Sequence, residues 1–148
     1  MGICIIDYDP SYAMPTVAMW RASKQRAIGQ EAIHSFDDHV YFLNHILVAT
    51  NKVLLAIESS GEQVAGILAC NPNWVNQLYV HPEHQGRGIG KTLLDLAKQQ
   101  AEERLCLYTF EVNRKARRFY ERNGFRIVGR GRENEEQLKD IRYEWIKP

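Results

Sequence analysis

The sequence predicts an α/β fold in which strands and helices alternate along one domain that spans residues 1–148. Short apolar runs typical of strands are separated by longer stretches whose apolar residues recur at helical spacing. The chain contains no internal repeat and no low-complexity linker. With 148 residues, of which 45% are hydrophobic, it can bury a core but has no room for two independent domains.

The N-terminal segment is predicted to form one strand and two helices. Residues 3–8 are a short apolar strand, and the turn sequence Asp9-Pro10-Ser11 precedes a helical pattern that runs to about Arg26. Residues 35–38, which read Ser-Phe-Asp-Asp, are a capping signal for a second helix that ends near Val48.

Three strands are predicted to follow. Residues 52–58 and 63–70 are apolar or alternate in polarity on either side of Ser59-Ser60-Gly61-Glu62, which predicts a hairpin. Residues 71–73, which read Asn-Pro-Asn, then turn the chain into a strand over residues 75–80.

The C-terminal half is predicted to continue the alternation. A helix is indicated by apolar residues at helical spacing, namely Ile89, Leu93, Leu96, Ala97 and Ala101. A buried strand over residues 105–112 leads to a further helix, which Gly124 is suited to end. One face of that helix carries Ala116, Phe119 and Tyr120. Strands over residues 125–131 and 141–146 complete the chain.

The segment Gln85-Gly86-Arg87-Gly88-Ile89-Gly90 lies between a predicted strand and a predicted helix. Its glycines remove side chains from the turn, so that its backbone N–H groups can all face one ligand. Free amides at a helix N-terminus, together with the positive end of the helix dipole, bind phosphate or pyrophosphate. The sequence therefore predicts a phosphorylated ligand.

Spacing distinguishes three kinds of glycine loop. A Walker loop requires Gly-x-x-x-x-Gly-Lys-Ser/Thr, but Gln85 stands where its first glycine belongs. A dinucleotide fingerprint requires Gly-x-Gly-x-x-Gly, and here the third glycine comes one residue early. The remaining pattern is Gln-x-x-Gly-x-Gly, matched at Gln85, Gly88 and Gly90 and preceded by Leu-Tyr-Val-His-Pro at residues 78–82. It resembles the acetyl-CoA loop of the GCN5-related N-acetyltransferases (GNAT family).

A second motif supports the resemblance. Residues 113–125 read Asn-Arg-Lys-Ala-Arg-Arg-Phe-Tyr-Glu-Arg-Asn-Gly-Phe and are similar to the family segment Asn-x-x-Ala-x-x-Phe-Tyr-x-x-x-Gly-Phe. The two motifs occur in the family's order, about 25 residues apart, and the similarity extends from roughly Val64 to Phe125. The resemblance implies the element order β-α-α-β-β-β-α-β-α-β-β, a mixed sheet covered by helices.

The resemblance also implies a site for acetyl-CoA. In the family, the strand before the glycine loop splays from its neighbour, and its backbone groups bind the pantetheine arm and the thioester carbonyl. Leu78 and Val80, with Tyr79 between them, match that strand. The loop binds pyrophosphate chiefly through main-chain amides, and its residues here are Gln85, Gly86, Arg87, Gly88, Ile89, Gly90 and Lys91.

Two residues of the second motif are candidates for chemistry and binding. Tyr120 matches the tyrosine that in many relatives hydrogen-bonds the CoA sulfur and serves as general acid. A phenol with an ordinary pKa of about 10 holds its proton at neutral pH and can donate it to a thiolate. The alternative role of Tyr120 is that of a tyrosine packed in the core. Asn113 has amide groups that can pair with the pantetheine amides, and it can equally cap a helix.

The general base is less clearly indicated. Some relatives place a glutamate on the strand before the loop, but residues 74–77 read Trp-Val-Asn-Gln and hold no carboxylate. Other relatives use a glutamate on the following strand, which Glu111 resembles; an exposed strand carboxylate is its alternative role. A chain of water molecules leading to bulk solvent is the third route.

The acceptor amine is expected over the two N-terminal helices and the loop that joins them, because that region varies within the family. Side chains available to line it are Trp20, His34, Tyr41, Phe42, Trp74 and Tyr108. The acids clustered nearby are Glu31, Asp37 and Asp38.

The net charge of +1 hides a local surplus of positive charge. Residues 1–80 carry 4 Lys/Arg against 7 Asp/Glu, whereas residues 81–132 carry 12 against 6. The surplus is either a solvated helix face or a field that attracts the ADP part of CoA. A nucleic-acid partner is not expected, because no recognition motif accompanies the surplus.

Metal, disulfide and membrane chemistry are not predicted. Cys4, Cys70 and Cys106 lie in apolar runs and are expected to be buried reduced thiols. No apolar run approaches the roughly 20 residues that span a bilayer, and no signal pattern is present, so a cytoplasmic location without membrane contact is expected.

Several histidines and acids could suggest a metal site or a surface role. His34, Asp37, Asp38 and His39 straddle a helix start, which is more typical of a capped, solvated first turn than of metal ligation. His81 and His84 flank a proline turn and are expected on the loop surface.

The sequence thus predicts an acyltransferase that moves an acetyl group from acetyl-CoA to a primary amine by direct transfer. The acceptor is a small molecule or a protein, and a homodimer is allowed. A non-catalytic acyl-CoA-sensing or interaction module is one alternative, because it would keep the motifs without turnover. A P-loop nucleotide enzyme is the other, although no Walker-type acidic strand end is found.

Overall fold

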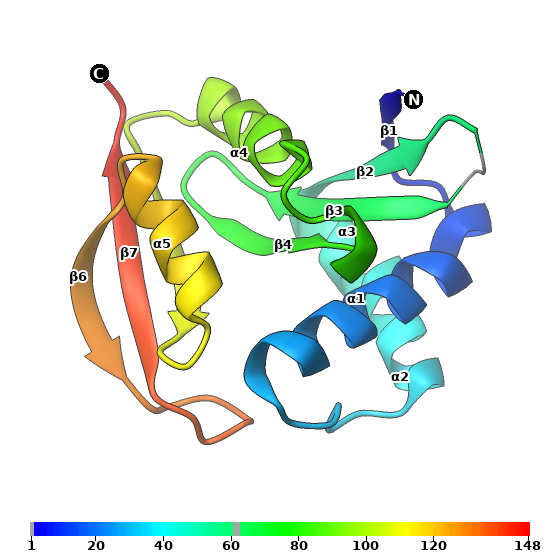
Figure 1. The fold of residues 1–148 in the computed structure, drawn as a ribbon, viewed down its shortest axis with the longest axis horizontal. Coiled ribbons are helices and arrows are strands. Elements are labelled where there is room, and N and C mark those ends of the chain that lie inside the picture. The colour runs from blue at the N-terminus through cyan, green and yellow to red at the C-terminus, as the bar shows by residue number, and fades with distance from the viewer. Residues whose placement is uncertain (1, 61–62) are drawn as a thin grey trace.

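The computed structural model describes residues 2–60 and 63–148, and Figure 1 shows two sheets flanked by helices. The first sheet has the order β1-β2-β3-β4 and is formed by Ile3–Asp7, Lys52–Glu58, Val64–Cys70 and Val75–Val80. The second has the order β5-β7-β6 and is formed by Arg104–Phe110, Asp140–Ile146 and Arg126–Gly131. Neighbouring strands within each of the two described sheets are antiparallel, and the predicted order β-α-α-β-β-β-α-β-α-β-β is confirmed.

Helices cover both faces of the first sheet. α1 (Ala13–Ile28) and the helices after it lie on one face, and α4 (Ile89–Gln100) lies on the other. Successive side chains of β2 point to opposite faces of the sheet. Leu54 lies in the apolar cluster under α4, and Leu55 lies in the cluster under α1. Because both faces are covered, β2 and β3 are nearly continuous apolar runs. Among the described residues, no helix has both the length and the apolar character to cross a bilayer.

The second predicted helix is a continuous helical run with a π-helical middle. Ser35 caps it, because its Oγ accepts the backbone N–H of Asp38 at 3.1 Å. α2 (Phe36–Tyr41) continues through a π-helical segment, Phe42–Leu47, into α3 (Val48–Thr50). The capping signal and the predicted end near Val48 are therefore confirmed to within two residues.

The two sheets diverge beyond the start of β4. An isolated parallel bridge pairs Trp74 with Cys106, and the Cys106 N–H donates to the carbonyl of Asn73 at 2.9 Å. Beyond that bridge, β4 pairs with β3 alone in the part of the chain that the structure describes. The other edge of β4 is open over its C-terminal half. α5 (Arg114–Arg122) lies between the second sheet and this edge (Figure 1).

β5 is shorter than the sequence suggests. It ends at Phe110 and not at Val112, because the Asn113 N–H donates to the Phe110 carbonyl at 3.0 Å and turns the chain into α5. Glu111 therefore follows the strand and does not lie within it. The hairpin of β2 and β3 forms as predicted, whereas Gly61 and Glu62 of its turn lie outside the described residues.

Only one of the three cysteines is buried. Cys70 is buried in β3, Cys106 is half-buried, and Cys4 is exposed. The prediction that all three cysteines are buried is wrong at Cys4, because β1 is an edge strand whose residues are exposed or half-buried. All three thiols are free.

Candidate active site

The open edge of β4 carries the backbone groups of Leu78 and Val80. The His81 N–H donates to the Ala65 carbonyl at 2.8 Å. The backbone N–H and C=O groups of His81, and of every second residue before it, therefore point toward β3. Hydrogen-bonding direction alternates along an antiparallel strand. The N–H and C=O groups of Leu78 and Val80 therefore point away from β3, into the space where the sheets diverge.

The Val80 carbonyl, at the end of the open edge, already accepts hydrogen bonds from within the protein. It accepts hydrogen bonds from Ser23 Oγ at 3.0 Å and from Gln85 Nε2 at 3.1 Å. These bonds attach the end of β4 to α1 and to the start of the glycine loop. The N–H of Val80 and both groups of Leu78 have no ladder partner among the described strands.

The glycine loop places free amides beside this edge. Gly86 and Gly88 have φ angles of +81° and +83°, and a side chain at either position would point into open space. Gly88 is the N-cap of α4, so the amides of Ile89, Gly90 and Lys91 have no acceptor within the helix. No other backbone acceptor is recorded for them in residues 2–60 and 63–148. Such amides can bind an anion.

α5 meets the loop and the end of β4 at Gly90. A side chain at Gly90 would contact Phe119 Cζ at 3.4 Å and Val80 Cγ2 at 3.7 Å. Lys115, also on α5, donates to Gln85 Oε1 at 3.1 Å. The structure thus gathers the strand, the loop and the second motif, which were predicted as parts of one site.

Tyr120 is buried next to this junction, with 7% of its surface exposed. Its ring packs edge to face on Phe119 and Phe125, at centroid distances of 5.3 and 5.6 Å. Burial raises the pKa of Tyr120 above its ordinary value, and the neighbouring phenol of Tyr79 raises it further. The phenol therefore keeps its proton at neutral pH and can donate it.

Asn113 is the N-cap of α5. Its Oδ1 accepts the backbone N–H of Ala116 at 3.2 Å, which confirms the capping role that the sequence offered as one of two. The cap uses the side-chain oxygen, and the NH₂ group can still donate to a ligand.

Glu111 lies at the start of the turn between β5 and α5. Its carboxylate is 3.5 Å from Arg130 on β6, and its N–H donates to the carbonyl of Lys139. The side chain therefore faces β6 and does not line the pocket between α1 and the β6–β7 loop. Its role as general base stays a prediction.

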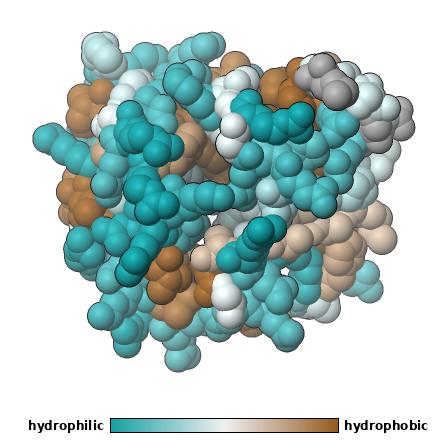
Figure 2. All heavy atoms as spheres, viewed as in Figure 1, coloured by the Kyte–Doolittle hydropathy of each residue, from teal (hydrophilic) through white to brown (hydrophobic). Residues whose placement is uncertain are grey.

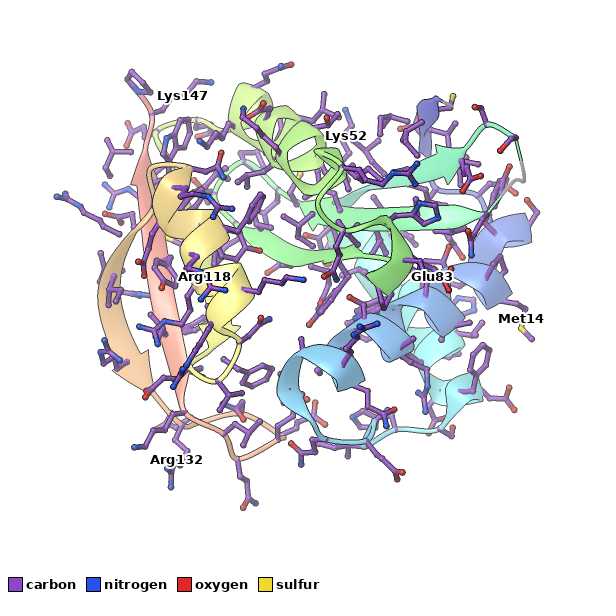
Figure 3. All side chains as sticks on the ribbon, viewed as in Figure 1. Met14, Lys52, Glu83, Arg118, Arg132 and Lys147 are labelled. Atoms are coloured by element: carbon purple, nitrogen blue, oxygen red, sulfur yellow. The ribbon has the colours of Figure 1, made fainter. Side chains whose placement is uncertain are left out.

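The basic residues of the loop are exposed and already have partners. Arg87 Nη1 lies 2.7 Å from His84 Nδ1, and Lys91 Nζ lies 2.9 Å from the carboxylate of Asp95. In Figure 3, Arg118 lies on α5 and Glu83 on the short helix Pro82–His84. Figure 2 shows that the surface over α5 is hydrophilic, as its arginines require.

His84 is buried, contrary to the expected surface position, with 6% of its surface exposed. Its Nε2 lies 2.9 Å from Gln63 Oε1 and 3.2 Å from a carboxylate oxygen of Glu58. The ring therefore anchors the loop to the ends of β2 and β3, while its Nδ1 contacts Arg87. His81 is half-buried and caps the short helix through its Nδ1.

A pocket of about 410 Å³ lies on the α1 side of β4. It is enclosed by the C-terminal half of α1, the α1–α2 loop, α2 and the β6–β7 loop, and Figure 1 shows the two loops approaching each other. Gln77 is the β4 residue that lines it. The predicted lining residues found there are Trp20, His34, Tyr41, Phe42, Glu31 and Asp38.

Trp74 and Tyr108 were expected in this lining but are not part of it. Their rings stack on each other at 5.6 Å, and Tyr108 lines a separate groove of about 620 Å³ on the outer face of the second sheet. Strand alternation explains the difference, because Leu107 and Thr109 point into the core and Tyr108 must point outward. Asp37 also does not line the pocket.

Two carboxylates of the pocket were missed by the sequence analysis, Glu135 and Glu136 in the β6–β7 loop. Lys24 Nζ donates to Glu136 Oε2 at 2.7 Å, and His34 Nε2 lies 2.5 Å from Glu135 Oε2. Burial acts to raise the pKa of Glu136, but the hydrogen bond and charge of Lys24 bring it below its usual value. The available signal was the acidic run Glu-Asn-Glu-Glu at residues 133–136.

His39 lies between Trp20 and Arg21 at the edge of this pocket. Its ring meets Trp20 at a centroid distance of 4.3 Å, and its Nδ1 is 3.5 Å from Arg21 Nη1. Burial lowers the pKa of His39 to about 4, and the charge of Arg21 contributes to the shift. Within the described residues, no cluster of three or more His, Cys, Asp or Glu side chains could hold a metal ion.

We expect stability to fall as pH drops from about 6.5 to about 4. The folded pKa of His39 is about 4, below the ordinary value of 6.5, so the unfolded chain binds more protons in this window. The stability from the neutral ring is complete above about pH 6.5 and is lost as pH falls through the folded pKa. Without screening by solvent, a pKa difference of this size corresponds to about 3 kcal/mol of unfolding free energy. Because the ring is only half-buried, we expect a loss of about 1 to 2 kcal/mol.

The measurement is urea unfolding of the parent and of His39→Asn at about pH 7 and about pH 5. The parent should lose more stability than the variant over this interval, because only the parent has the neutral His39 ring to protonate. The carboxylates are the same in both proteins, so their contribution cancels in the comparison. Equal losses would show that His39 is not held neutral by the fold.

Comparison with known proteins identifies the family. The family model for the acetyltransferase (GNAT) domain matches residues 43–127. An uncharacterized N-acetyltransferase of Archaeoglobus fulgidus is 30% identical over 112 residues, which cover 61% of this chain and 76% of the relative. The chain belongs to the GNAT acetyltransferase family.

Solved structures confirm the mixed α+β fold of the GNAT family. Apo-form YjaB from Escherichia coli superposes with a TM-score of 0.80 at 20% identity, over 100% of both chains. YncA from Salmonella typhimurium, solved with its cofactor acetyl-CoA, has a TM-score of 0.76 at 17% identity, over 100% of this chain and 95% of that one.

Proposed function

We propose that this protein transfers an acetyl group from acetyl-CoA directly to a primary amine. The observation that carries the proposal is the junction at Gly90, where the open edge of β4, the free amides of the loop and the helix of Tyr120 meet. Membership of the GNAT family and the acetyl-CoA in the YncA structure support the choice of cosubstrate.

Each part of the junction has a role in holding acetyl-CoA. The backbone groups of Leu78 and Val80 would bind the pantetheine arm, with Tyr79 between them facing β3. The NH₂ group of Asn113 would donate to a pantetheine carbonyl. Main-chain amides of the loop would hold the pyrophosphate, and the loop consists of Gln85, Gly86, Arg87, Gly88, Ile89, Gly90 and Lys91.

Direct transfer requires a neutral amine, a stabilised oxyanion and a proton for the leaving sulfur. The amine nitrogen forms a bond to the thioester carbonyl carbon, and the carbonyl electrons move to oxygen. The C–S bond then breaks, sulfur leaves with its electron pair, and Tyr120 gives sulfur a proton. A substrate that binds as its ammonium first releases one proton to solvent and becomes the neutral amine. After attack the nitrogen loses its second proton to Glu111 or to solvent, and solvent returns a proton to Tyr120. The products are an amide and the CoA thiol.

The test is an acetyl-transfer assay with a panel of amines: amino acids, polyamines, aminoglycosides and peptide N-termini. Thiol release and product mass are measured together, and we expect amine-dependent release with a product heavier by one acetyl group. Acetyl-CoA binding without turnover on any amine would favour the sensing module. Binding of ATP without binding of acetyl-CoA would favour a nucleotide enzyme.

A further inference from the structure

We propose that the pocket between α1 and the β6–β7 loop binds the acceptor as a zwitterionic amino acid with an apolar side chain. Its ammonium would lie against Glu136 and its carboxylate against Lys24. The inference rests on the proposed function, because it names the acceptor class of that transfer.

The ion pair between Lys24 and Glu136 connects α1 to the β6–β7 loop across the pocket wall. The two charged atoms are 2.7 Å apart, and the side chains are only 32% and 14% exposed. The Lys24 hydrogen bond occupies Oε2 of the carboxylate. A carboxylate has about four acceptor positions on its two oxygens, so Glu136 can accept an ammonium N–H while it still contacts Lys24.

The charge balance of this pair determines which ligand it suits. A simple monoamine would add a positive charge beside Lys24, and displacing Lys24 would leave its ammonium without an anion. A poorly hydrated charge without a partner is costly. A zwitterion adds no net charge and gives each member of the pair an opposite charge, so that the four charges alternate in sign.

The other charged residues of the lining are Arg21, Glu31, Asp38 and Glu135, and its apolar part suits an apolar side chain. A volume of about 410 Å³ is sufficient for an amino acid. The apolar and aromatic residues of its lining are Trp20, Ile28, Ile33, Tyr41, Phe42 and Ile46. Gln30 also lines the pocket, and its Oε1 is buried without a hydrogen-bond donor among the described residues, so it is a second acceptor for an ammonium N–H.

The pocket adjoins the cofactor site through β4 and α1. Gln77 of β4 lines the pocket, and Trp20 of α1, which also lines it, stacks on Tyr79 of β4 at a ring-centroid distance of 6.1 Å. Ser23 of α1 donates to the Val80 carbonyl at 3.0 Å. The wall of the pocket and the open edge of β4 therefore share the same two elements.

The experiment compares substrates that differ only in the carboxylate. With saturating acetyl-CoA, kcat/KM is measured for L-phenylalanine, L-leucine and their amides. We expect the parent to favour each amino acid over its amide by at least about tenfold. Lys24→Gln should bring that ratio close to one, and comparing ratios between variants cancels the different amine pKa values of the substrates. Glu136→Gln should lower kcat/KM for all four substrates by at least about tenfold.

A matched control uses an ion pair outside the pocket. Arg104 lies 3.2 Å from Glu144 on the second sheet, and the pair has exposures of 52% and 16%. Arg104→Gln should leave the substrate ratio unchanged. If the amides are used as well as the amino acids, or if the ratio persists in Lys24→Gln, the zwitterion assignment is wrong.

A binding measurement separates this failure from failure of the proposed function. Calorimetry of L-phenylalanine with the parent in the presence of CoA should show binding that weakens at least about tenfold in Lys24→Gln and in Glu136→Gln. Acetyl-CoA affinity should be unchanged in both variants, which also shows that they are folded. Turnover on other amines with no binding of L-phenylalanine or L-leucine would overturn the inference alone. Binding of L-phenylalanine without turnover on any amine would overturn the proposed function and leave the pocket assignment standing.

Discussion

Tyr120→Phe is expected to slow acetyl transfer by about 10²- to 10⁴-fold while acetyl-CoA affinity changes little. The substitution keeps the ring, and with it the edge-to-face contacts to Phe119 and Phe125. It removes the hydroxyl, which is protonated at neutral pH as any phenol is, and whose pKa burial raises further. The rate must be measured in a single turnover, because product release could otherwise hide a change in the chemical step.

Tyr143→Phe is the matched control for this prediction. Tyr143 is fully buried, its ring centroid is 6.1 Å from that of Tyr120, and its hydroxyl donates to Glu121 at 2.6 Å. The same loss of one hydroxyl should therefore affect stability and leave the single-turnover rate near that of the parent. If folded Tyr120→Phe transfers acetyl as fast as the parent, Tyr120 is a packing residue and sulfur takes its proton from water.

Gly88→Val is expected to weaken acetyl-CoA binding by at least about tenfold. Gly88 has a φ of +83°, which a β-branched residue adopts only with strain, and its position at the N-cap of α4 determines where the loop amides point. A valine side chain would also project into the open space from which the pyrophosphate approaches. Calorimetry with acetyl-CoA measures the loss.

Gly29→Val separates backbone strain from loss of the site. Gly29 has a φ of +70°, a side chain there would also meet open space, and it is the C-cap of α1. Both substitutions should destabilise the fold by about 1 to 2 kcal/mol in urea unfolding. Only Gly88→Val should weaken acetyl-CoA binding, and undiminished affinity in the folded Gly88→Val variant would contradict the role of the loop.

The parts of the fold and site that depend on local chemistry were predictable from the sequence. Glycine spacing after a strand predicted a helix that begins at the end of the loop, and the structure places its N-cap at Gly88. The capping sequence at Ser35 predicted the start of α2. In both cases the residues that determine the conformation are adjacent in the chain. The second motif was likewise predictable as one short helix, because Asn113 caps α5 and Tyr120 lies within it.

The pocket between α1 and the β6–β7 loop was only partly predictable because it depends on contacts between distant segments. Lys24 and Glu136 are separated by 112 positions, and their contact depends on how the β6–β7 loop folds back toward α1. Tyr108 was misplaced for a different reason: alternation along β5 directs Leu107 and Thr109 into the core and Tyr108 outward. His84 is buried because Gln63 and Glu58, from another hairpin, surround it.

Amide hydrogen exchange, with and without acetyl-CoA, tests the cofactor site most directly. In the free protein the amides of Leu78, Val80 and residues 89–91 lack backbone partners among the described residues and should exchange fast. Acetyl-CoA should slow them by at least about tenfold, while residues 129–132 in the outer groove stay unchanged. Protection in the outer groove, with none along β4 and the glycine loop, would contradict the proposed site.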